Sequence, residues 1–186
     1  MDSASMNAVA EALAAEGIRV ARFEFSYMAA RRSGGSRKPP PRADRLTGEY
    51  LDAVRTLRQN GPLVIGGKSM GGRVASMVAD ELYEDGKIAG VVCFGYPFHP
   101  PSKPDLLRTA HLENLATPTL IFQGTRDPFG TIHEVPSYSL SKAIELVWLE
   151  DGDHDLKPRK RVAGLTVADH LKTMAQRASS WIANLL

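Results

Sequence analysis

The sequence predicts an α/β fold, a three-layer sandwich in which helices flank a mostly parallel sheet of about five strands. Strand-like apolar segments alternate with helix-like segments along the chain, which is typical of a parallel sheet covered on both faces. A length of 186 residues suits one well-buried domain, so we expect a single domain over residues 1–186. Chemistry in open parallel sheets lies beyond the carboxyl ends of the strands, so the residues that follow each strand are the functional candidates.

The first third of the chain contains a helix, a strand and a second helix. Residues 7–16 are strong helix formers, and Gly17 stands where a helix would stop. Residues 18–25 alternate apolar and polar side chains, as a strand near the edge of a sheet does. A basic loop follows, and a helix is then expected at 43–59, where the Asn-Gly-Pro sequence of residues 60–62 ends it.

Strands and helices keep alternating through the rest of the chain. Strands are expected at residues 63–66, 88–94, 119–123 and 144–149. Helices are expected at residues 72–84, 105–115, 132–139 and 167–186. With the strand at 18–25, these segments make up the sheet of about five strands and its covering layers.

The segment between the second expected strand and the helix after it fits G-x-S-x-G, the pattern of a nucleophile elbow. Ser69 is flanked by the glycine pairs 66–67 and 71–72, which let backbones approach closely in a strained turn. The pentapeptide is common, so a simple glycine-rich connection is the alternative. A phosphate-binding loop is excluded, because its first glycine would be Pro62 and its loop would hold the apolar residues 63–65.

Two residues that suit a serine nucleophile follow later strands. Asp127 comes directly after the fourth expected strand and His154 directly after the fifth. A nucleophilic serine needs a base within hydrogen-bond reach and an acid that orients the base, and the order serine, acid, histidine is that of elbow-type hydrolases. Alternatively, Asp127 only starts a turn before Pro128, and His154 is a surface histidine in an acidic loop. The histidines that follow no strand directly are His99, His111, His133 and His170.

Three aspartates near the candidate histidine resemble the first ligands of a calcium loop. They are Asp151, Asp153 and Asp155. The pattern then fails, because Leu156 stands where the loop needs glycine and Val162 where it needs a bidentate glutamate. The sequence also has no Cys/His cluster. We therefore expect no metal and no cofactor.

A basic segment without intervening acids stands out against a net charge of only +2. Its cations are Arg31, Arg32, Arg37, Lys38 and Arg42. The segment could attract an anion, but its glycine, serine and proline content favours a solvated loop over a nucleic-acid site. A nucleic-acid partner is therefore the less favoured interpretation of residues 31–45.

The distribution of apolar and basic residues also indicates where in the cell the protein is expected. No apolar run approaches the roughly 18 residues needed to span a bilayer, so we expect no membrane partner. Residues 1–6 have neither a basic segment nor an apolar one, and a cytoplasmic location is therefore the expectation. The only cysteine, Cys93, lies in the apolar run 91–94 and is expected to be a buried, inert thiol.

These residues resemble the α/β-hydrolase superfamily. The nearest resemblance is to small bacterial hydrolases of the group that contains testis-expressed protein and a subunit of the non-specific-lethal histone acetyltransferase complex, with dienelactone hydrolase more distant. The matching segments are residues 22–28, 66–72, 95–100, 123–128 and 151–154. The resemblance implies a triad of Ser69, Asp127 and His154, with the backbone amide of Met70 as one oxyanion donor.

One feature of such hydrolases is not visible in the sequence. They usually have, before the first helix seen here, a strand that ends in a His-Gly-Gly type loop, whose amide is the second oxyanion donor. The family places that strand between the equivalents of the strands at 18–25 and 63–66, so its loss would leave a gap or force new pairing. We expect either that Met1 is an internal methionine of a longer protein or that Tyr27 or Ser26 contributes a donor in a short variant.

The leading hypothesis is a serine hydrolase that cleaves a carboxylic ester or thioester of a small molecule through an acyl-enzyme. The rival is a catalytically weak or inactive hydrolase-fold domain that binds or scaffolds partners. Neither the substrate nor the oligomeric state follows from the sequence. Side chains expected to line the substrate pocket are Tyr27, Tyr96, Phe98, His99 and Phe129.

Overall fold

The computed structural model describes residues 3–32, 34, 39–57 and 61–185. Within them, the strands form one four-stranded sheet, and every pair of neighbouring strands is parallel. In spatial order the strands are β1 (Val64–Lys68), β2 (Gly90–Phe94), β3 (Thr119–Gly124) and β4 (Ile144–Leu149). This arrangement confirms the predicted α/β class with a parallel sheet flanked by helices.

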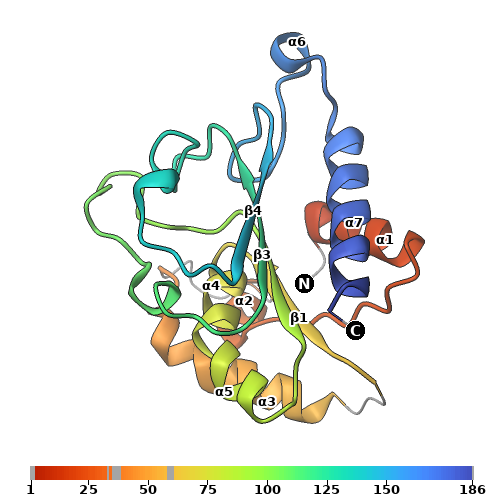
Figure 1. Ribbon diagram of the computed structural model, residues 1–186, viewed down its shortest axis with the longest axis vertical. Helices are drawn as coiled ribbons and strands as arrows, with labels where there is room; N and C mark the ends of the chain where they lie inside the picture. Colours follow the sequence, from red (N-terminus) through yellow and green to blue (C-terminus); the bar gives the residue numbers. More distant parts are fainter. Residues whose placement is uncertain (1–2, 33, 35–38, 58–60, 186) are drawn as a thin grey trace.

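Helices cover both faces of the sheet (Figure 1). Because the strand order follows the chain, right-handed crossovers place successive connections on the same face. That face carries α3 (Thr47–Thr56), α4 (Met70–Met77), α5 (Ala79–Glu84) and the 3₁₀ helices η1 (Ala43–Leu46), η2 (Ala110–Leu112) and η3 (Val135–Ser137). The opposite face carries α1 (Ala4–Ala15) and α7 (Val167–Ala183), which pack against each other.

Strand β2 shows why the sheet can be covered on both sides. Val91 and Cys93 belong to the core on the α4 face, whereas Val92 and Phe94 belong to the core on the α7 face. Successive side chains of a strand point to opposite faces, so a doubly covered strand must be apolar at every position. The Cys93 thiol is fully buried, as predicted, and burial raises its pKa to about 12.

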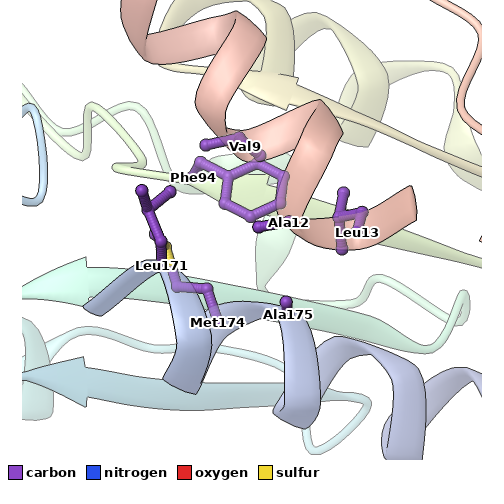
Figure 2. A pocket seen from close by; sticks show the side chains of 7 residues that line it. All are labelled: Val9, Ala12, Leu13, Phe94, Leu171, Met174 and Ala175. Atoms are coloured by element: carbon purple, nitrogen blue, oxygen red, sulfur yellow. The ribbon is translucent and has the colours of Figure 1, made fainter. Parts of the chain in front are cut away.

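A small apolar pocket lies in the seam between α1 and α7 (Figure 2). Its lining residues are Val9, Ala12 and Leu13 of α1, Phe94 of β2, and Leu171, Met174 and Ala175 of α7. None of these side chains carries a polar group, so the seam can hold α1 against the sheet but offers nothing that would orient a polar substrate.

The prediction of a strand at residues 18–25 was wrong. Residues 18–25 form no strand. The outer edge of β1 is bonded by the side chain of Tyr50 instead. The Tyr50 hydroxyl donates to the Gly66 carbonyl at 2.7 Å and accepts the Gly66 N–H at 3.0 Å, the groups that a neighbouring strand would bond. Phe23 and Phe25 pack their rings on Tyr50 instead of pairing with β1. The described sheet therefore has four strands rather than about five.

Several helices also differ from the expected ones. The helix expected at 72–84 is interrupted at Val78, which separates α4 from α5. The segments 105–115 and 132–139 contain only the single turns η2 and η3. Two short helices were not expected, α2 (Ser26–Arg32) and α6 (Lys160–Ala163).

The basic segment lies only partly within the described residues. Arg31 and Arg32 end α2, whereas Arg37 and Lys38 fall outside the part of the chain that the structure describes. In the described part of the chain, no helix combines the length and the apolar composition that crossing a bilayer requires.

Candidate active site

Ser69 stands in a strained turn between β1 and α4. Its φ of 52° and ψ of −115° lie in a region that non-glycine residues rarely adopt, which is the signature of a nucleophile elbow. Two neighbouring glycines make the turn sterically feasible. A Cβ on Gly67 would lie 2.6 Å from the Gly71 carbonyl carbon, and one on Gly72 would lie 2.8 Å from the Gly67 oxygen. The predicted elbow is therefore present, for the steric reason its motif suggested.

His154 connects the serine to the aspartate. Its Nε2 lies 2.8 Å from Ser69 Oγ, and its Nδ1 lies 2.9 Å from Asp127 Oδ2. Because an ionised carboxylate only accepts hydrogen bonds, Nδ1 carries the proton and Nε2 is free to accept the serine hydroxyl hydrogen. The structure thus brings together the three side chains that the sequence singled out at the ends of β1, β3 and β4.

Asp127 is fully buried, and both of its carboxylate oxygens are used. Oδ2 accepts from His154 Nδ1 and from Gln123 Nε2, the latter at 3.0 Å. Oδ1 accepts from the Phe129 backbone N–H at 2.9 Å, which is the turn interaction that the plainer interpretation of Asp127 predicted. Asp127 therefore both starts a turn and bonds the histidine, because the turn fixes the carboxylate that accepts from His154.

Gln123 supports this carboxylate and was given no role by the sequence interpretation. Its side chain is fully buried at the end of β3 and bonds in four directions. Nε2 donates to Asp127 Oδ2, to the Tyr96 carbonyl and to the Gly130 carbonyl, and Oε1 accepts the Tyr96 N–H. A glutamine directly after the apolar residues 120–122 of this strand was the available signal, because a buried amide needs partners.

An aromatic ring and a glycine both lie close to the histidine ring. The Phe129 ring centroid lies 4.1 Å from that of His154, with 32° between the ring planes. Gly95 also lies close to this histidine, because a Cβ at Gly95 would lie 2.8 Å from the His154 carbonyl oxygen and 3.5 Å from its Nδ1. Gly95 also has a φ of 66°, so a larger residue there would be strained as well as crowded.

A family model described as alpha/beta hydrolase domain matches residues 1–183. The chain belongs to the alpha/beta hydrolase family. Solved structures agree with this at the level of fold. An alpha-beta serine hydrolase homologue from Coxiella burnetii is 19% identical, with a TM-score of 0.65 over 100% of this chain and 78% of that one.

Two other solved structures share the same fold with the alpha/beta hydrolase described here. A Xanthomonas campestris protein assigned to the alpha/beta superfamily of hydrolases is 21% identical, with a TM-score of 0.62 over 100% of this chain and 92% of that one. The esterase domain of a Rhodothermus marinus protein is 17% identical, with a TM-score of 0.57 over 95% of this chain and 78% of that one. At such identities these likenesses show the fold alone.

The residues expected to line a substrate pocket of this alpha/beta hydrolase fall into two groups. Tyr96, Phe98 and His99 are at most 2% exposed, so their side chains belong to the interior in this structure rather than to an open wall. Phe129 is half-buried against His154, and Tyr27 is half-buried between the Phe25 ring and the Arg31 guanidinium. Phe129 is therefore the predicted pocket residue that touches the Ser69–His154–Asp127 group.

Met70, the expected oxyanion donor, is the first residue of α4. The first N–H groups of a helix have no acceptor within the helix, and the helix dipole adds positive charge at this end. The Met70 amide follows Ser69 directly, so it stands where negative charge would develop next to the serine oxygen.

A second serine–histidine pair involves Ser76, about two helical turns farther along α4. Ser76 Oγ is 2.9 Å from His111 Nε2, but Ser76 is only 2% exposed. Its single hydroxyl hydrogen is donated to the Arg73 carbonyl at 2.8 Å, so His111 is not its base. Burial, together with the positive charge of Arg73, lowers the pKa of His111 to about 4. Within the described part of the chain, no carboxylate forms a hydrogen bond with His111, and the other group at its Nε2 is the Tyr96 hydroxyl at 3.3 Å.

Among the described residues, no group of three His, Cys, Asp or Glu side chains is gathered as metal ligands. The aspartates that resembled a calcium loop instead form ion pairs and accept hydrogen bonds from nearby backbone N–H groups. Arg159 bonds both oxygens of Asp151, and these hydrogen bonds lower the pKa of Asp151 to about 2. Asp153 accepts the backbone N–H groups of Asp155 and Lys157.

Proposed function

We propose that this alpha/beta hydrolase cleaves a carboxylic ester or thioester of a small molecule through an acyl-enzyme on Ser69. One observation carries the proposal. Ser69, His154 and Asp127 form a continuous hydrogen-bonded chain of 2.8 Å and 2.9 Å from three loops at the same end of the sheet. A strained, partly exposed serine with a base and a buried acid in line matches the needs of nucleophilic catalysis.

In the first step, Ser69 Oγ attacks the carbonyl carbon of the substrate while its proton moves to His154 Nε2. The imidazolium that forms keeps its Nδ1–H bonded to Asp127, whose buried negative charge stabilises it. Asp127 holds this position because Gln123 and the Phe129 amide occupy its remaining acceptor sites. His154 then gives its proton to the departing alcohol or thiol.

In the second step, water takes the place of the leaving group. His154 Nε2 removes a proton from the water as the water oxygen attacks the acyl carbon. The bond between the acyl carbon and Ser69 Oγ then breaks, and His154 returns the proton to Ser69 Oγ, which releases the acid and restores the free enzyme. The Met70 amide stabilises the oxyanion in both tetrahedral intermediates, and removing one such donor typically costs roughly 100- to 1,000-fold in rate. A second donor, from Tyr27, would add to this stabilisation. Ser26 does not suit that role, because its N–H and its hydroxyl both donate to Glu49 Oε2 at 2.8 Å.

The finer relationship is also part of the proposal. We place the chain among the small bacterial hydrolases that resemble testis-expressed protein, on the strength of the G-K-S-M-G-G elbow and the G-D-H segment around His154. A neutral or weakly charged small ester is the substrate class that a half-buried aromatic such as Phe129 beside His154 would accommodate.

Hydrolysis of p-nitrophenyl acetate and of a short-chain acyl thioester tests the proposal. The wild-type protein should turn over at least one of them, and Ser69→Ala, folded by circular dichroism, should not. If the folded wild type hydrolyses neither, the chain is better described as an inactive hydrolase-fold domain that binds or scaffolds partners. Equal activity of wild type and Ser69→Ala would also overturn the assigned nucleophile.

A further inference from the structure

Two cations reach the loop that carries His154, and each directly precedes another member of the triad. Lys68 precedes Ser69, and its Nζ donates to Asp155 Oδ1 at 2.6 Å. Arg126 precedes Asp127 and donates to the backbone carbonyls of Asp151 and Lys157, at 2.7 Å and 3.0 Å. The histidine loop, residues 150–157, is thus tied to the neighbours of both residues that His154 must bond.

The two cations differ in what they hold. Arg126 bonds two backbone carbonyls of the histidine loop and also the Asp153 carboxylate, so its loss would weaken the fold of the loop itself. Lys68 instead bonds only the side chain of Asp155, which is directly attached to His154 along the chain. The histidine loop keeps its own shape without Lys68, because Asp153 Oδ1 accepts the N–H groups of Asp155 and Lys157 at 2.9 Å and 3.0 Å.

The Lys68–Asp155 pair is too exposed to matter much for folding. The side chains are 22% and 48% exposed, and exposed ion pairs typically add at most about 1 kcal/mol to stability. The bond from Lys68 is the main reason why the pKa of Asp155 is lowered. The same pair spans the gap between β1 and the histidine loop, next to the Ser69–His154 hydrogen bond. A contact with little effect on stability therefore lies where small displacements matter most for proton transfer.

We propose that Lys68 and Asp155 are positioning residues, an ion-pair clamp that fixes His154 Nε2 against Ser69 Oγ. This inference rests on the proposed function, because the clamp aligns the same proton transfer. A misplacement of about 1 Å in a catalytic group can cost on the order of 100-fold in rate. The clamp acts on the alignment of the base and does not touch the substrate, so its loss should lower kcat and leave KM nearly unchanged.

The test compares Lys68→Met and Asp155→Asn with a matched control, Lys157→Met. Lys157 Nζ also approaches Asp155, at 3.5 Å from Oδ2, but it does not adjoin Ser69. We expect kcat for the test ester to fall roughly 10- to 100-fold in Lys68→Met and Asp155→Asn and to change less than about twofold in Lys157→Met. The double variant should be no worse than either single variant, because both remove the same interaction.

A structural role would give a different pattern. The melting temperature of the clamp variants should stay within about 2 °C of wild type, and Lys68→Arg should restore most of kcat. Arg126→Met supplies the contrast, because it should lower the melting temperature clearly. Unchanged kcat in Lys68→Met, additive losses in the double variant, or a loss of kcat that follows the melting temperature would each overturn the clamp.

Failure of the clamp is distinguishable from failure of the proposed function. If the wild type turns over the ester while the clamp variants match it, the clamp alone is wrong. If the wild type does not turn over any ester, long-range ¹H–¹⁵N NMR of the His154 ring decides. Asp127 keeps Nδ1 protonated in both proteins, so the Nε2 resonance reports the hydrogen bond to Ser69. A ¹⁵Nε2 shift that differs between wild type and Lys68→Met supports the clamp, and the same shift in both overturns it.

Discussion

The described residues contain two serine–histidine hydrogen bonds of nearly equal length, one at Ser69 and His154 and one at Ser76 and His111. The distances are 2.8 Å and 2.9 Å, and both serines belong to the start or the body of α4. Their surroundings differ in every respect that matters for nucleophilic chemistry. Ser69 is partly exposed and its backbone is strained, whereas Ser76 is buried in a regular helix and donates to its own helix.

The difference lies in the third partner of each histidine. His154 faces the buried Asp127 carboxylate, which orients its proton and would stabilise its charged form. His111 faces the Tyr96 hydroxyl and the positive charge of Arg73, and its pKa is lowered to about 4. A serine–histidine distance alone therefore does not make a nucleophile, and the acid, the strain and the access decide which pair can react.

The largest expected effect separates the two serines directly. Ser69→Ala should lower kcat by about 10⁵-fold or more, as loss of a nucleophile does in serine hydrolases. Ser76→Ala should keep kcat within about threefold of wild type, because its hydroxyl only satisfies neighbours in the interior. Steady-state kinetics on the same ester compare the two variants, and a comparable loss of kcat in both would break the comparison.

The next effect concerns the acid that His111 lacks. Asp127→Asn keeps the shape of the side chain but removes the charge and allows an amide N–H to face His154 Nδ1. That change favours the wrong tautomer, and kcat should fall by about 10⁴-fold. Measurement of kcat near neutral pH checks this value. A loss below about tenfold would mean that Asp127 serves only the turn to Phe129.

A smaller effect is expected on stability, where substitutions of Gln123 and Tyr96 should lower the free energy of unfolding by different amounts. Gln123→Leu would leave the Tyr96 N–H and the Gly130 carbonyl buried without their partner, so the free energy of unfolding should fall by roughly 3 kcal/mol. Tyr96→Phe removes only contacts of 3.3 to 3.5 Å and should cost about 1 kcal/mol or less. Urea unfolding measures both values, and an equal cost would contradict the central place of Gln123.

The smallest effect is the pH dependence that His111 confers. Its folded pKa, about 4, lies below the ordinary value of 6.5, so the unfolded chain takes up the proton first. The stabilisation is complete above about pH 6.5 and is lost as the pH falls toward about 4. For this half-buried group we expect a loss of about 1 to 2 kcal/mol over that window.

His111→Gln is the variant that isolates this contribution. Its unfolding free energy should fall less than that of wild type when urea titrations at about pH 7 and about pH 4.5 are compared. Identical pH dependence in the two proteins would show that His111 is accessible to protons in the folded state.

The sequence was sufficient for the elbow and for the order of the triad. Gly67 and Gly72 mark the elbow in the sequence, because a Cβ at either position would clash with the neighbouring backbone. Asp127 and His154 could be selected because each follows the end of a parallel strand. Such signals are local, and the topology of a parallel sheet brings them to the same edge.

The rest depended on contacts between segments far apart in the sequence. The alternation at 18–25 suggested a strand, but the Tyr50 hydroxyl bonds the edge of β1 that this strand would need. Tyr96 was expected to line a pocket, yet it is fully buried with its hydroxyl toward His111. Gln123 gained its role only through the three acceptors that the fold brings around it.

The proposed mechanism requires that Ser69, and not Ser76, is the reactive serine. Incubation with a fluorophosphonate, followed by proteolysis and mass spectrometry of the labelled peptide, tests this directly. We predict a single adduct on Ser69 that is absent from His154→Ala and unaffected in His111→Gln. An adduct on Ser76, or a folded wild-type protein that takes up no label, would contradict the account.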